Sequence, residues 1–500
     1  MNLHAVSDRN WHECEDYNRA ARSLPGCQRF QVMAGEHGSH KMNTSEWINR
    51  GVTMLRTGSL KGVAQAAEVL SSPSKAAARS TKERLGATLR REEEALSPRV
   101  LRRTLVELQS IVDPKVSEVE GGRRARGVAG WYASATPEQR YDMWLLMSEQ
   151  FVADPVKVKA AQAKYTAAVG TPDEAAAEVN YRRATVSPRR RLLQRFSVNP
   201  EGIRFLVDMR AEMQPRLKAD KRLMALDVEM EYMFSTWFDV GFLDLRRISW
   251  DSPASLIEKL IKYEAVHDIR GWADVKNRLD SDRRCYGFFH PRLPEEPLIF
   301  VEVALMDDMA SSITPLLDES AAPANLSKAT HAIFYSISNT QTGLKGVSFG
   351  DSLIKRVVDT LKDEFPKLKT FVTLSPIPGL RPWLSKNAPP DLLKAWEQAL
   401  ELPANAPERV ALMSKAAQYL AQEMRDGKPL DPVARFHLGN GARVERINWA
   451  GDPSTKGMKQ SYGLMVNYLY DLKRLDRHRA LLAQGKIPTA PAVGKLMPTP

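Results

Sequence analysis

Cysteine and long apolar runs are both scarce in this sequence. Only three of its 500 residues are cysteine, too few for a disulfide framework, which favours a reducing compartment. No uninterrupted apolar run approaches the roughly 18 residues that a membrane-spanning helix requires, so no membrane span is expected. Hydrophobic residues make up 43% of the chain and charged residues 26%, which excludes a mostly disordered or collagen-like protein.

Positive charge is in excess. Lysine and arginine total 72 against 60 aspartate and glutamate residues, which gives a formal net charge of +12. The excess indicates an anionic partner, and nucleic acid, an anionic membrane surface and a phosphorylated small molecule all satisfy it. The length predicts two or three domains, each able to bury its own core.

The first 41 residues differ from the rest because they show no helical or strand periodicity. We expect residues 1–41 to be a disordered leader or a mis-assigned start, with Met42 as the alternative first residue. Residue types that suit zinc are also present there, namely Cys14, Cys27, His37 and His40. Their spacing lacks the short cysteine pair of a zinc knuckle, so the leader interpretation is favoured. An apolar signal segment is absent, and early acidic residues argue against a transit peptide.

From residue 45 to about residue 265 the pattern is helical. Thr136, Pro137 and Gln139 make a clear helix start, because they supply a cap, a first helical residue and the second half of a capping box. Similar periodicity marks the segments 203–213, 221–238 and 253–265.

Arginine is concentrated in this helical part. The densest run contains Arg182, Arg183, Arg189, Arg190 and Arg191. Such a run can contact nucleic acid, but aromatic residues are not interleaved with it and it carries no groove-reading motif. A solvated helix face or a subunit contact is therefore the favoured interpretation.

After residue 280 the pattern changes to short β-rich runs that alternate with helices. We expect strands at 285–289, 298–305, 332–337, 369–374 and 442–449. We expect helices at 353–365, about 389–425 and 457–483. The sequence thus predicts an all-α half followed by an α/β half, with the boundary near 265–280.

A glycine-rich loop, residues 341–350, lies between an expected strand and a helix that begins near Asp351. Its glycines permit positive φ and close approach, so backbone N–H groups, the helix N-terminus and Lys345 can face a phosphate. The loop is neither a Walker loop nor the GxGxxG fingerprint. It resembles the pyrophosphate-binding loop of GNAT-type acyltransferases that use coenzyme A. An ordinary strand-to-helix turn is the alternative.

Two further residues are candidates for chemistry. Ser375 follows an expected strand and precedes a Pro-Ile-Pro-Gly turn, at the end of a strand where α/β sheets place ligands. Its hydroxyl can bond a substrate carboxylate, or it can simply cap the turn. His437 lies between apolar residues ahead of an Asn-Gly turn. It is either a satisfied structural histidine or the best available group that titrates near neutral pH.

Several motifs together, in this order, resemble the malonyl-CoA decarboxylase family. They are Tyr263-Glu264-Ala265-Val266-His267, Arg283-Arg284-Cys285-Tyr286, the segment 332–338, the glycine-rich loop, Leu374-Ser375-Pro376-Ile377-Pro378-Gly379, Phe436-His437-Leu438-Gly439-Asn440-Gly441, Arg446-Ile447-Asn448-Trp449, Gly463-Leu464-Met465 and Asn467-Tyr468. The resemblance covers roughly residues 125–475 and is dense after residue 260.

The resemblance implies an α + α/β architecture. Its parts are a helical oligomerisation domain at 42–265, a GNAT-like catalytic domain that binds coenzyme A at 266–485, and a flexible tail at 486–500. It implies that Ser375 and His437 are the catalytic pair and that Tyr470 is a further active-site residue. The implied substrate-binding stretch is Lys345, Gly346, Val347, Ser348, Phe349, Gly350 and Asp351.

The implied reaction converts malonyl-CoA to acetyl-CoA and CO₂ through an enolate. We expect Ser375 to hydrogen-bond the carboxylate, His437 to protonate the α-carbon as a general acid, and backbone N–H groups to stabilise the enolate oxygen. No metal or organic cofactor is expected, because the thioester accepts the electrons and coenzyme A enters as part of the substrate. The expected partners are malonyl-CoA, acetyl-CoA and further copies of the chain in a dimer or tetramer, without nucleic acid.

Two alternatives stay open on the residues alone. One is a GNAT-type N-acyltransferase that uses the same loop to modify an amine. The other is a basic, non-enzymatic protein that binds nucleic acid through the arginines of 182–195, with a steep salt dependence. Animal members of the resembled family end in a peroxisomal Ser-Lys-Leu, whereas this chain ends in Met497-Pro498-Thr499-Pro500. We therefore expect a cytoplasmic enzyme of the bacterial type.

Overall fold

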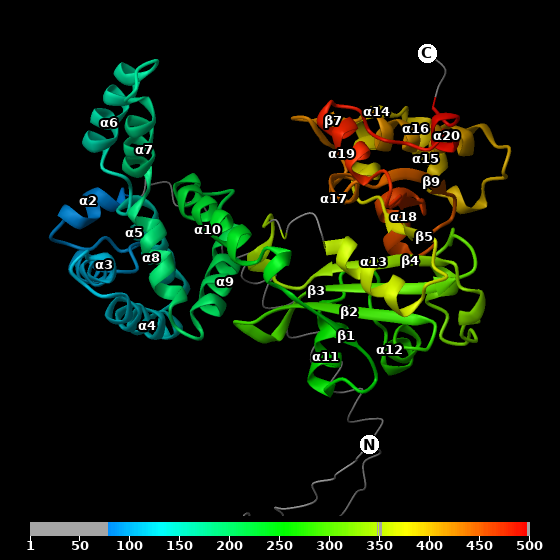
Figure 1. Ribbon diagram of the computed structural model, residues 1–500, viewed down its shortest axis with the longest axis horizontal. Coiled ribbons are helices and arrows are strands. Elements are labelled where there is room, and N and C mark those ends of the chain that lie inside the picture. The colour runs from blue at the N-terminus through cyan, green and yellow to red at the C-terminus, as the bar shows by residue number, and fades with distance from the viewer. Residues whose placement is uncertain (1–78, 348, 350–352, 498–500) are drawn as a thin grey trace, which may run out of the picture. The chain divides into compact units, whose positions relative to one another are not determined.

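The structure is a computed structural model that describes residues 79–347, 349 and 353–497 (Figure 1). The predicted leader at 1–41 and its zinc-type residues, Cys14, Cys27, His37 and His40, lie outside the described residues. Ser348, Gly350 and Asp351 of the predicted substrate-binding stretch also lie outside them. Within the described ranges, no helix is both long and apolar enough to cross a membrane.

Helices occupy the chain from residue 81 to residue 237. They are α2 (Thr81–Gly86), α3 (Pro98–Val112), α4 (Glu118–Ser134), α5 (Pro137–Glu149), α6 (Pro155–Ala168), α7 (Glu174–Thr185), α8 (Pro188–Ser197), α9 (Gly202–Met213) and α10 (Met224–Trp237). Side-chain caps fix many of their first turns. The predicted capping box of α5 is confirmed, since the Thr136 hydroxyl accepts from the Gln139 N–H and the Gln139 side chain accepts from the Thr136 N–H.

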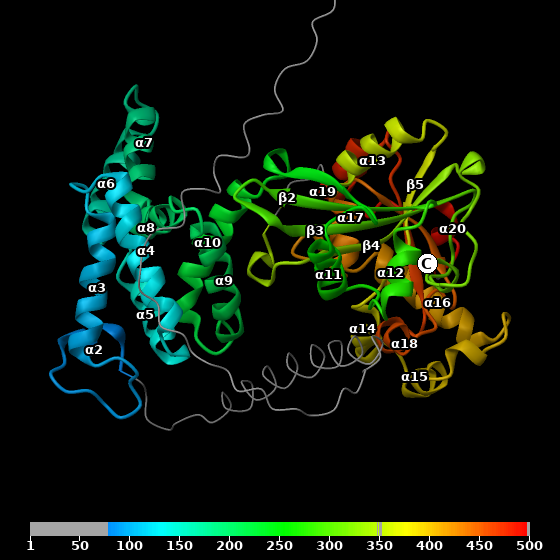
Figure 2. The same ribbon diagram turned by 90° about the horizontal axis from the view of Figure 1, so that it is seen from below.

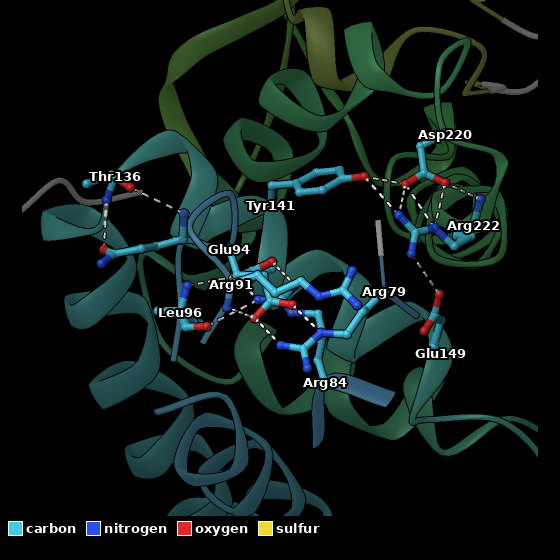
Figure 3. Close-up of polar contacts among 12 residues, drawn as sticks. Arg79, Arg84, Arg91, Glu94, Leu96, Thr136, Tyr141, Glu149, Asp220 and Arg222 are labelled. Carbon is cyan, nitrogen blue, oxygen red and sulfur yellow. Dashed lines mark hydrogen bonds and ion pairs between the residues drawn. The ribbon is translucent and has the colours of Figure 1, made fainter. Parts of the chain in front are cut away.

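Ion pairs with partly or fully buried side chains connect residues of the helical part. Figure 3 shows Arg79 and Arg84 close to Glu94, and the Arg79 Nε donates to Glu94 Oε1 at 2.8 Å. Arg84 also donates from Nη2 to the Leu96 carbonyl at 3.3 Å. On the other side of this part, Arg222 pairs with Asp220 at 2.7 Å. These bonds satisfy the charges of Arg84 and Glu94, which are removed from water.

The arginine run does not form one solvated face. Arg189 is only 4% exposed, and its guanidinium donates to the carbonyls of Met147, Ser148 and Ala225. Arg190 pairs with Glu229 at 2.7 Å. The prediction of a solvated face is therefore wrong for Arg189, because the planar guanidinium can donate to several carbonyls at once and so be buried without an acidic partner.

A large sheet follows the helical part. Its strands are β1 (Asp244–Ile248), β2 (Arg283–His290), β3 (Leu293–Met306), β4 (His331–Asn339), β5 (Thr370–Thr373), β6 (Ser375–Pro376), β9 (Arg443–Asn448) and β10 (Met465–Leu469). They run in the order β1-β2-β3-β4-β5-β10-β6, and β9 pairs with β10. Among these strands, β4 and β5 are the pair that runs in parallel, because the glycine-rich loop and α13 (Leu353–Glu364) carry the chain back between them.

Helices cover both faces of the sheet. The apolar stripe of α13 packs against Phe288 and Phe334 on one face. The other face is covered by α11 (Ala254–Tyr263) and α12 (Trp272–Arg278), which cluster with Phe300. Figure 2 shows α13 on one side of the sheet and α11 and α12 on the other. The predicted α + α/β class, with a helical part before a mixed-sheet part, is thereby confirmed.

The remaining helices lie between and after the later strands. They are α14 (Leu380–Asn387), α15 (Pro390–Trp396), α16 (Pro407–Ala421), α17 (Pro432–Gly439), α18 (Thr455–Ser461), α19 (Leu475–Ala483) and α20 (Pro491–Gly494). A short hairpin of β7 (Met424–Arg425) and β8 (Lys428–Pro429) joins α16 to α17.

Two strands interrupt stretches that the sequence predicted to be helical. Strand β1 lies within 42–265 and pairs with β2 at the edge of the sheet. Strand β10 lies within 457–483, where Tyr462 (φ 53) and Gly463 (φ 78) end α18 and redirect the chain. Both strands were missed because each is only five residues long and depends on its neighbours in the sheet for its hydrogen bonds.

The end of the described chain is packed rather than flexible. The Val444 N–H donates to the Pro488 carbonyl at 3.0 Å, and the Ala490 N–H donates back to the Val444 carbonyl at 2.8 Å. Val493 is completely buried. The predicted flexible tail at 486–500 is therefore wrong for the described residues up to 497, because pairing with β9 and burial of an apolar side chain hold them in place.

Candidate active site

Strands β4 and β5 separate at Ser375. Their parallel pairing runs from His331 opposite Thr370 to Phe334 opposite Thr373, and the last bond joins the Leu374 N–H to the Phe334 carbonyl at 2.9 Å. On its other side β5 already pairs with β10, and β6, which begins at Ser375, continues to pair with β10. The chain therefore leaves β4 but keeps β10 at Ser375, and this opening of a sheet at the carboxyl end of a parallel strand is a usual place for a ligand.

The three predicted catalytic residues lie in contact with one another. Ser375 Oγ is 3.3 Å from His437 Nε2, and Tyr470 Oη is 2.7 Å from His437 Nδ1. His437 lies in the last turn of α17, while Tyr470 directly follows β10. All three side chains are buried, with exposed fractions of 3 to 5%. The structure thus joins residues from three separate segments into one hydrogen-bonded chain.

Thr373 extends this chain and was not singled out from the sequence. Ser375 Oγ donates to Thr373 Oγ1 at 2.8 Å, and the Tyr468 N–H donates to the same oxygen at 3.1 Å. Since Ser375 has a single hydroxyl proton, the bond to His437 requires the proton on Nε2, and Tyr470 then donates to Nδ1. Thr373 could have been found from the period of two along a strand, which puts it on the same side as Ser375.

Tyr468 forms the wall beside the imidazole. Its ring stacks on His437 with centroids 4.8 Å apart and planes 25° apart. Phe436 closes a second side with an edge contact at 5.1 Å. Tyr468 is one of the residues that carry the family resemblance, but the expected helix at 457–483 hid its position. Only the strand pairing of β10 places its ring over His437.

Burial sets the electrostatics of this chain of residues. Removal from water lowers the pKa of the His437 imidazole to about 3, so the imidazole is neutral at neutral pH. The expectation that His437 titrates near neutral pH is therefore wrong for the protein without substrate. Burial also raises the pKa of the Tyr470 phenol, against an opposing effect of the Arg479 charge. Tyr470 therefore keeps its proton and can donate it to Nδ1.

The glycine-rich loop is held in place by contacts with α9. Arg210 donates from Nη1 to the carbonyls of Gly343 at 2.8 Å and Lys345 at 3.0 Å. Gly343 lies so close to α9 that a Cβ there would be 1.9 Å from the Val207 carbonyl oxygen. Lys345 and Gly346, which has φ +84°, stay exposed on the outer side.

Two predicted binding residues anchor the loop instead of facing outwards. Val347 and Phe349 are each 8% exposed and belong to the main hydrophobic core. The Phe349 carbonyl also accepts from the Val240 N–H at 2.8 Å. These side chains are therefore committed to packing, and the exposed residues of the described part of the loop are Thr342, Lys345 and Gly346. Among the described residues, no cluster of His, Cys, Asp and Glu has the arrangement of a metal site.

Comparison with solved structures finds proteins of similar sequence and fold. Malonyl-CoA decarboxylase from Rhodopseudomonas palustris is 41% identical with a TM-score of 0.70, and the match covers 79% of this chain and 99% of that one. Malonyl-CoA decarboxylase from Agrobacterium vitis is 39% identical with a TM-score of 0.72, and the match covers 79% of this chain and 100% of that one.

Curated proteins and family models agree with these structures. The mitochondrial malonyl-CoA decarboxylase of Anser anser anser is 38% identical over 331 residues, which is 58% of this chain and 65% of the goose protein. This chain thus spans slightly less than two thirds of that relative's length. Models described as the malonyl-CoA decarboxylase N-terminal and C-terminal domains match residues 151–238 and 241–500. With more than half of its length matched by the C-terminal model alone, the chain belongs to the malonyl-CoA decarboxylase family.

Proposed function

We propose that this chain catalyses the decarboxylation of malonyl-CoA to acetyl-CoA and CO₂. The observation that carries the proposal is the buried chain of contacts from Thr373 through Ser375 and His437 to Tyr470, at the point where β4 and β5 separate. The membership of the family supports the choice of substrate. The similarity to malonyl-CoA decarboxylases along most of the chain does not favour an N-acyltransferase.

The reaction leaves an electron pair on the acyl group. When the carboxylate departs as CO₂, the electrons of the broken carbon–carbon bond form an enolate with the thioester oxygen. One proton must then reach the α-carbon, so the enzyme takes up one proton for each turnover. Backbone N–H groups near the thioester stabilise the enolate oxygen, and removal of one such donor commonly costs about 10²–10³-fold in kcat.

In this mechanism Ser375 acts on the carboxylate of the substrate and His437 acts on its α-carbon. The Ser375 hydroxyl donates to the departing carboxylate and holds it out of the thioester plane. The negative charge of that carboxylate raises the pKa of the neighbouring imidazole, which otherwise is kept low by burial. His437 therefore becomes a competent acid when substrate is bound, and its Nε2 gives the proton to the α-carbon. Tyr470 holds the other ring nitrogen and fixes the ring orientation.

The glycine-rich loop binds the coenzyme A part of the substrate in this proposal. Lys345 and Gly346 offer an exposed charge and an accessible backbone, and both stand on a loop that Arg210 holds in place. Ser348, Gly350 and Asp351 complete the proposed stretch. The reaction needs no metal or organic cofactor, because the thioester itself delocalises the electron pair.

Self-association and location complete the proposal. The helical part is proposed to mediate a dimer or tetramer, and exposed valines on α6 and α7 support this choice. A cytoplasmic location is proposed on the low cysteine content of the chain. The goose and mouse relatives are named as mitochondrial proteins, so cell fractionation decides between these compartments.

The direct test is incubation of the purified protein with malonyl-CoA, followed by mass spectrometry of acetyl-CoA, with and without prior dialysis against EDTA. We expect product at the same rate in both arms. Ser375→Ala should lower kcat about 10²–10³-fold and His437→Ala about 10²–10⁴-fold, while acetyl-CoA binding stays close to that of the wild type. The matched control is Ser385→Ala, because that exposed hydroxyl bonds only the Pro382 carbonyl among the described residues. Undiminished kcat in either active-site variant would remove that residue from the mechanism.

A further inference from the structure

Ser375 and His437 belong to segments that meet only through tertiary contacts. Ser375 starts the turn that runs through Pro376 and Pro378 to Gly379, whereas His437 stands near the end of α17. A proton donor and a hydroxyl that act on one substrate must keep a fixed separation. Something in the fold therefore has to hold the turn and the helix at one distance from each other.

The carboxylate of Asp431 contacts both segments. Asp431 is the N-cap of α17, and its Oδ1 accepts from the Val433 N–H at 2.9 Å and from the Ala434 N–H at 3.1 Å. Its other oxygen, Oδ2, accepts from the Gly379 N–H at 3.1 Å. One oxygen thus binds the helix that carries His437, and the other binds the turn that carries Ser375.

The turn approaches this carboxylate more closely than a side chain at residue 379 would allow. A Cβ at Gly379 would lie 2.1 Å from Tyr419 Oη and 3.1 Å from Asp431 Oδ2. Tyr419 Oη donates to the same Oδ2 at 3.4 Å. Glycine at this position therefore permits the contact between the turn and Asp431, and Tyr419 closes it from the side.

Asp431 is buried and surrounded by its hydrogen-bond donors. The residue is 1% exposed, and the donors that face it are three backbone N–H groups and one phenol. Burial raises the pKa of this carboxyl, and the backbone donors oppose that rise. The dipole of α17 also favours negative charge at its first turn. A buried group that is bonded on both oxygens has little freedom to move, so it transmits a fixed geometry.

We infer that Asp431 is a positioning residue, whose two carboxylate oxygens fix the separation of Ser375 and His437 by binding one segment each. The inference rests on the proposed decarboxylation, because it concerns the geometry of that reaction. A carboxylate suits the task since it offers two acceptor oxygens that point in different directions. Serine at the same position keeps the cap but cannot reach Gly379, and asparagine keeps one acceptor and presents an N–H₂ group in place of the other.

The test compares Asp431→Ser and Asp431→Asn with the wild type in the full-length protein. Both variants retain an acceptor for the first turn of α17, and both lose the acceptor for Gly379. We expect kcat to fall about 10- to 100-fold, because displacement of a catalytic group by about 1 Å commonly costs that much. The KM for malonyl-CoA and the Kd for acetyl-CoA should stay within about threefold, since the glycine-rich loop is not touched.

The matched control is Asp154→Ser. Asp154 caps α6 in the same way, accepting from the N–H groups of Val156 and Lys157, but it is exposed and lies in the helical part. This variant should keep wild-type kcat. A thermal melt of each variant separates lost positioning, which leaves one cooperative transition, from loss of the fold.

Two results would overturn the inference. One is wild-type kcat in both Asp431 variants, which would mean that the turn and the helix keep their distance without the carboxylate. The other is a parallel loss of kcat, acetyl-CoA affinity and cooperative melting in the isosteric Asp431→Asn protein, which would assign the residue to folding alone. Failure of the proposed function is distinct from both, because the wild type itself would then release no acetyl-CoA from malonyl-CoA.

Discussion

His437 is held by Ser375 and Tyr470 and covered by the ring of Tyr468, while no ion pair to it occurs in the part of the chain that the structure describes. Burial is therefore the cause of its lowered pKa. In the proposed mechanism, the imidazole is neutral at rest and becomes an acid only when the anionic substrate is bound. The same burial leaves a measurable effect on stability.

The first prediction concerns pH and stability. The folded pKa of His437, about 3, lies below the ordinary value of 6.5, so between these pH values the unfolded chain binds a proton that the folded chain does not. Stability is complete above about pH 6.5 and falls as the pH drops towards 3, by at most about 1.4 kcal/mol per pH unit. The melting temperature should therefore fall less between pH 7 and pH 5 in His437→Gln than in the wild type.

A second buried histidine, His267, also lowers the stability of both proteins at acid pH in that experiment. Burial lowers the pKa of His267 to about 4, so His267 contributes its own acid loss of stability in both proteins. The comparison between wild type and His437→Gln removes this shared part. Equal falls in melting temperature would show that the His437 imidazole is protonated in the fold at pH 5.

At the scale of elements, the contact between α9 and the short helix Thr342–Leu344 holds the glycine-rich loop. The backbone at Gly343 lies directly against the backbone of α9 at Val207, and Arg210 is almost completely buried beneath the loop at 1% exposure. The loop is thus held by a helix of the preceding part of the chain. Its geometry depends on that packing as much as on its own glycines.

We predict that Gly343→Ala damages both the fold and the binding of coenzyme A. The new Cβ would lie 1.9 Å from the Val207 carbonyl oxygen, so α9 and the loop must move apart. Overpacking of this kind costs about 1–3 kcal/mol of stability. Thermal melting and calorimetric titration with acetyl-CoA measure the two effects, and we expect at least tenfold weaker binding.

The control for this prediction is another glycine-to-alanine change. Gly130 lies in the exposed interior of α4, and a Cβ there would have no atom within 4 Å. Gly130→Ala should leave acetyl-CoA binding unchanged and stabilise the helix by about 1 kcal/mol. Binding losses of equal size in the two variants would show that the effect at Gly343 does not come from its contact with α9.

At the scale of the whole molecule, α6 and α7 stand out because none of their residues is buried. The two helices lie side by side (Figure 1) and are joined by the stacked rings of Tyr165 and Tyr181 at 5.9 Å. Valines 156, 169 and 179 are 44 to 74% exposed along this pair. Such an apolar surface favours contact with another protein surface, and a second copy of this chain is the proposed partner.

The prediction at the scale of the whole molecule introduces a negative charge into this surface and measures self-association. Val179→Asp places a carboxylate on α7 and should weaken self-association at least tenfold, or about 1.4 kcal/mol, as measured by sedimentation equilibrium. The control is Val100→Asp on α3, whose valine is similarly exposed at 41%. Unchanged sedimentation of Val179→Asp would place the subunit contact elsewhere on the chain.

Local patterns in the sequence were enough to define most elements and two of the candidate catalytic residues, Ser375 and His437, whereas Tyr470 came only from the family resemblance. The cap at Thr136, the stripe of α13 and the turn after Ser375 depend on residues only a few positions apart, so periodicity and turn chemistry reveal them. The family resemblance added the roles of Ser375, His437 and Tyr470, which stay predictions until the variants are assayed.

Only the tertiary structure decided how these residues work together. Strand β10 depends on pairing with β9 and β6, and that pairing brings Tyr468 over His437. The neutral state of the imidazole follows from burial by segments distant in the chain, and the link from Asp431 to Gly379 spans 52 residues. Residue type and local spacing specify what a side chain is able to do. Desolvation and long-range hydrogen bonds, which exist only in the folded chain, determine its charge and its neighbours.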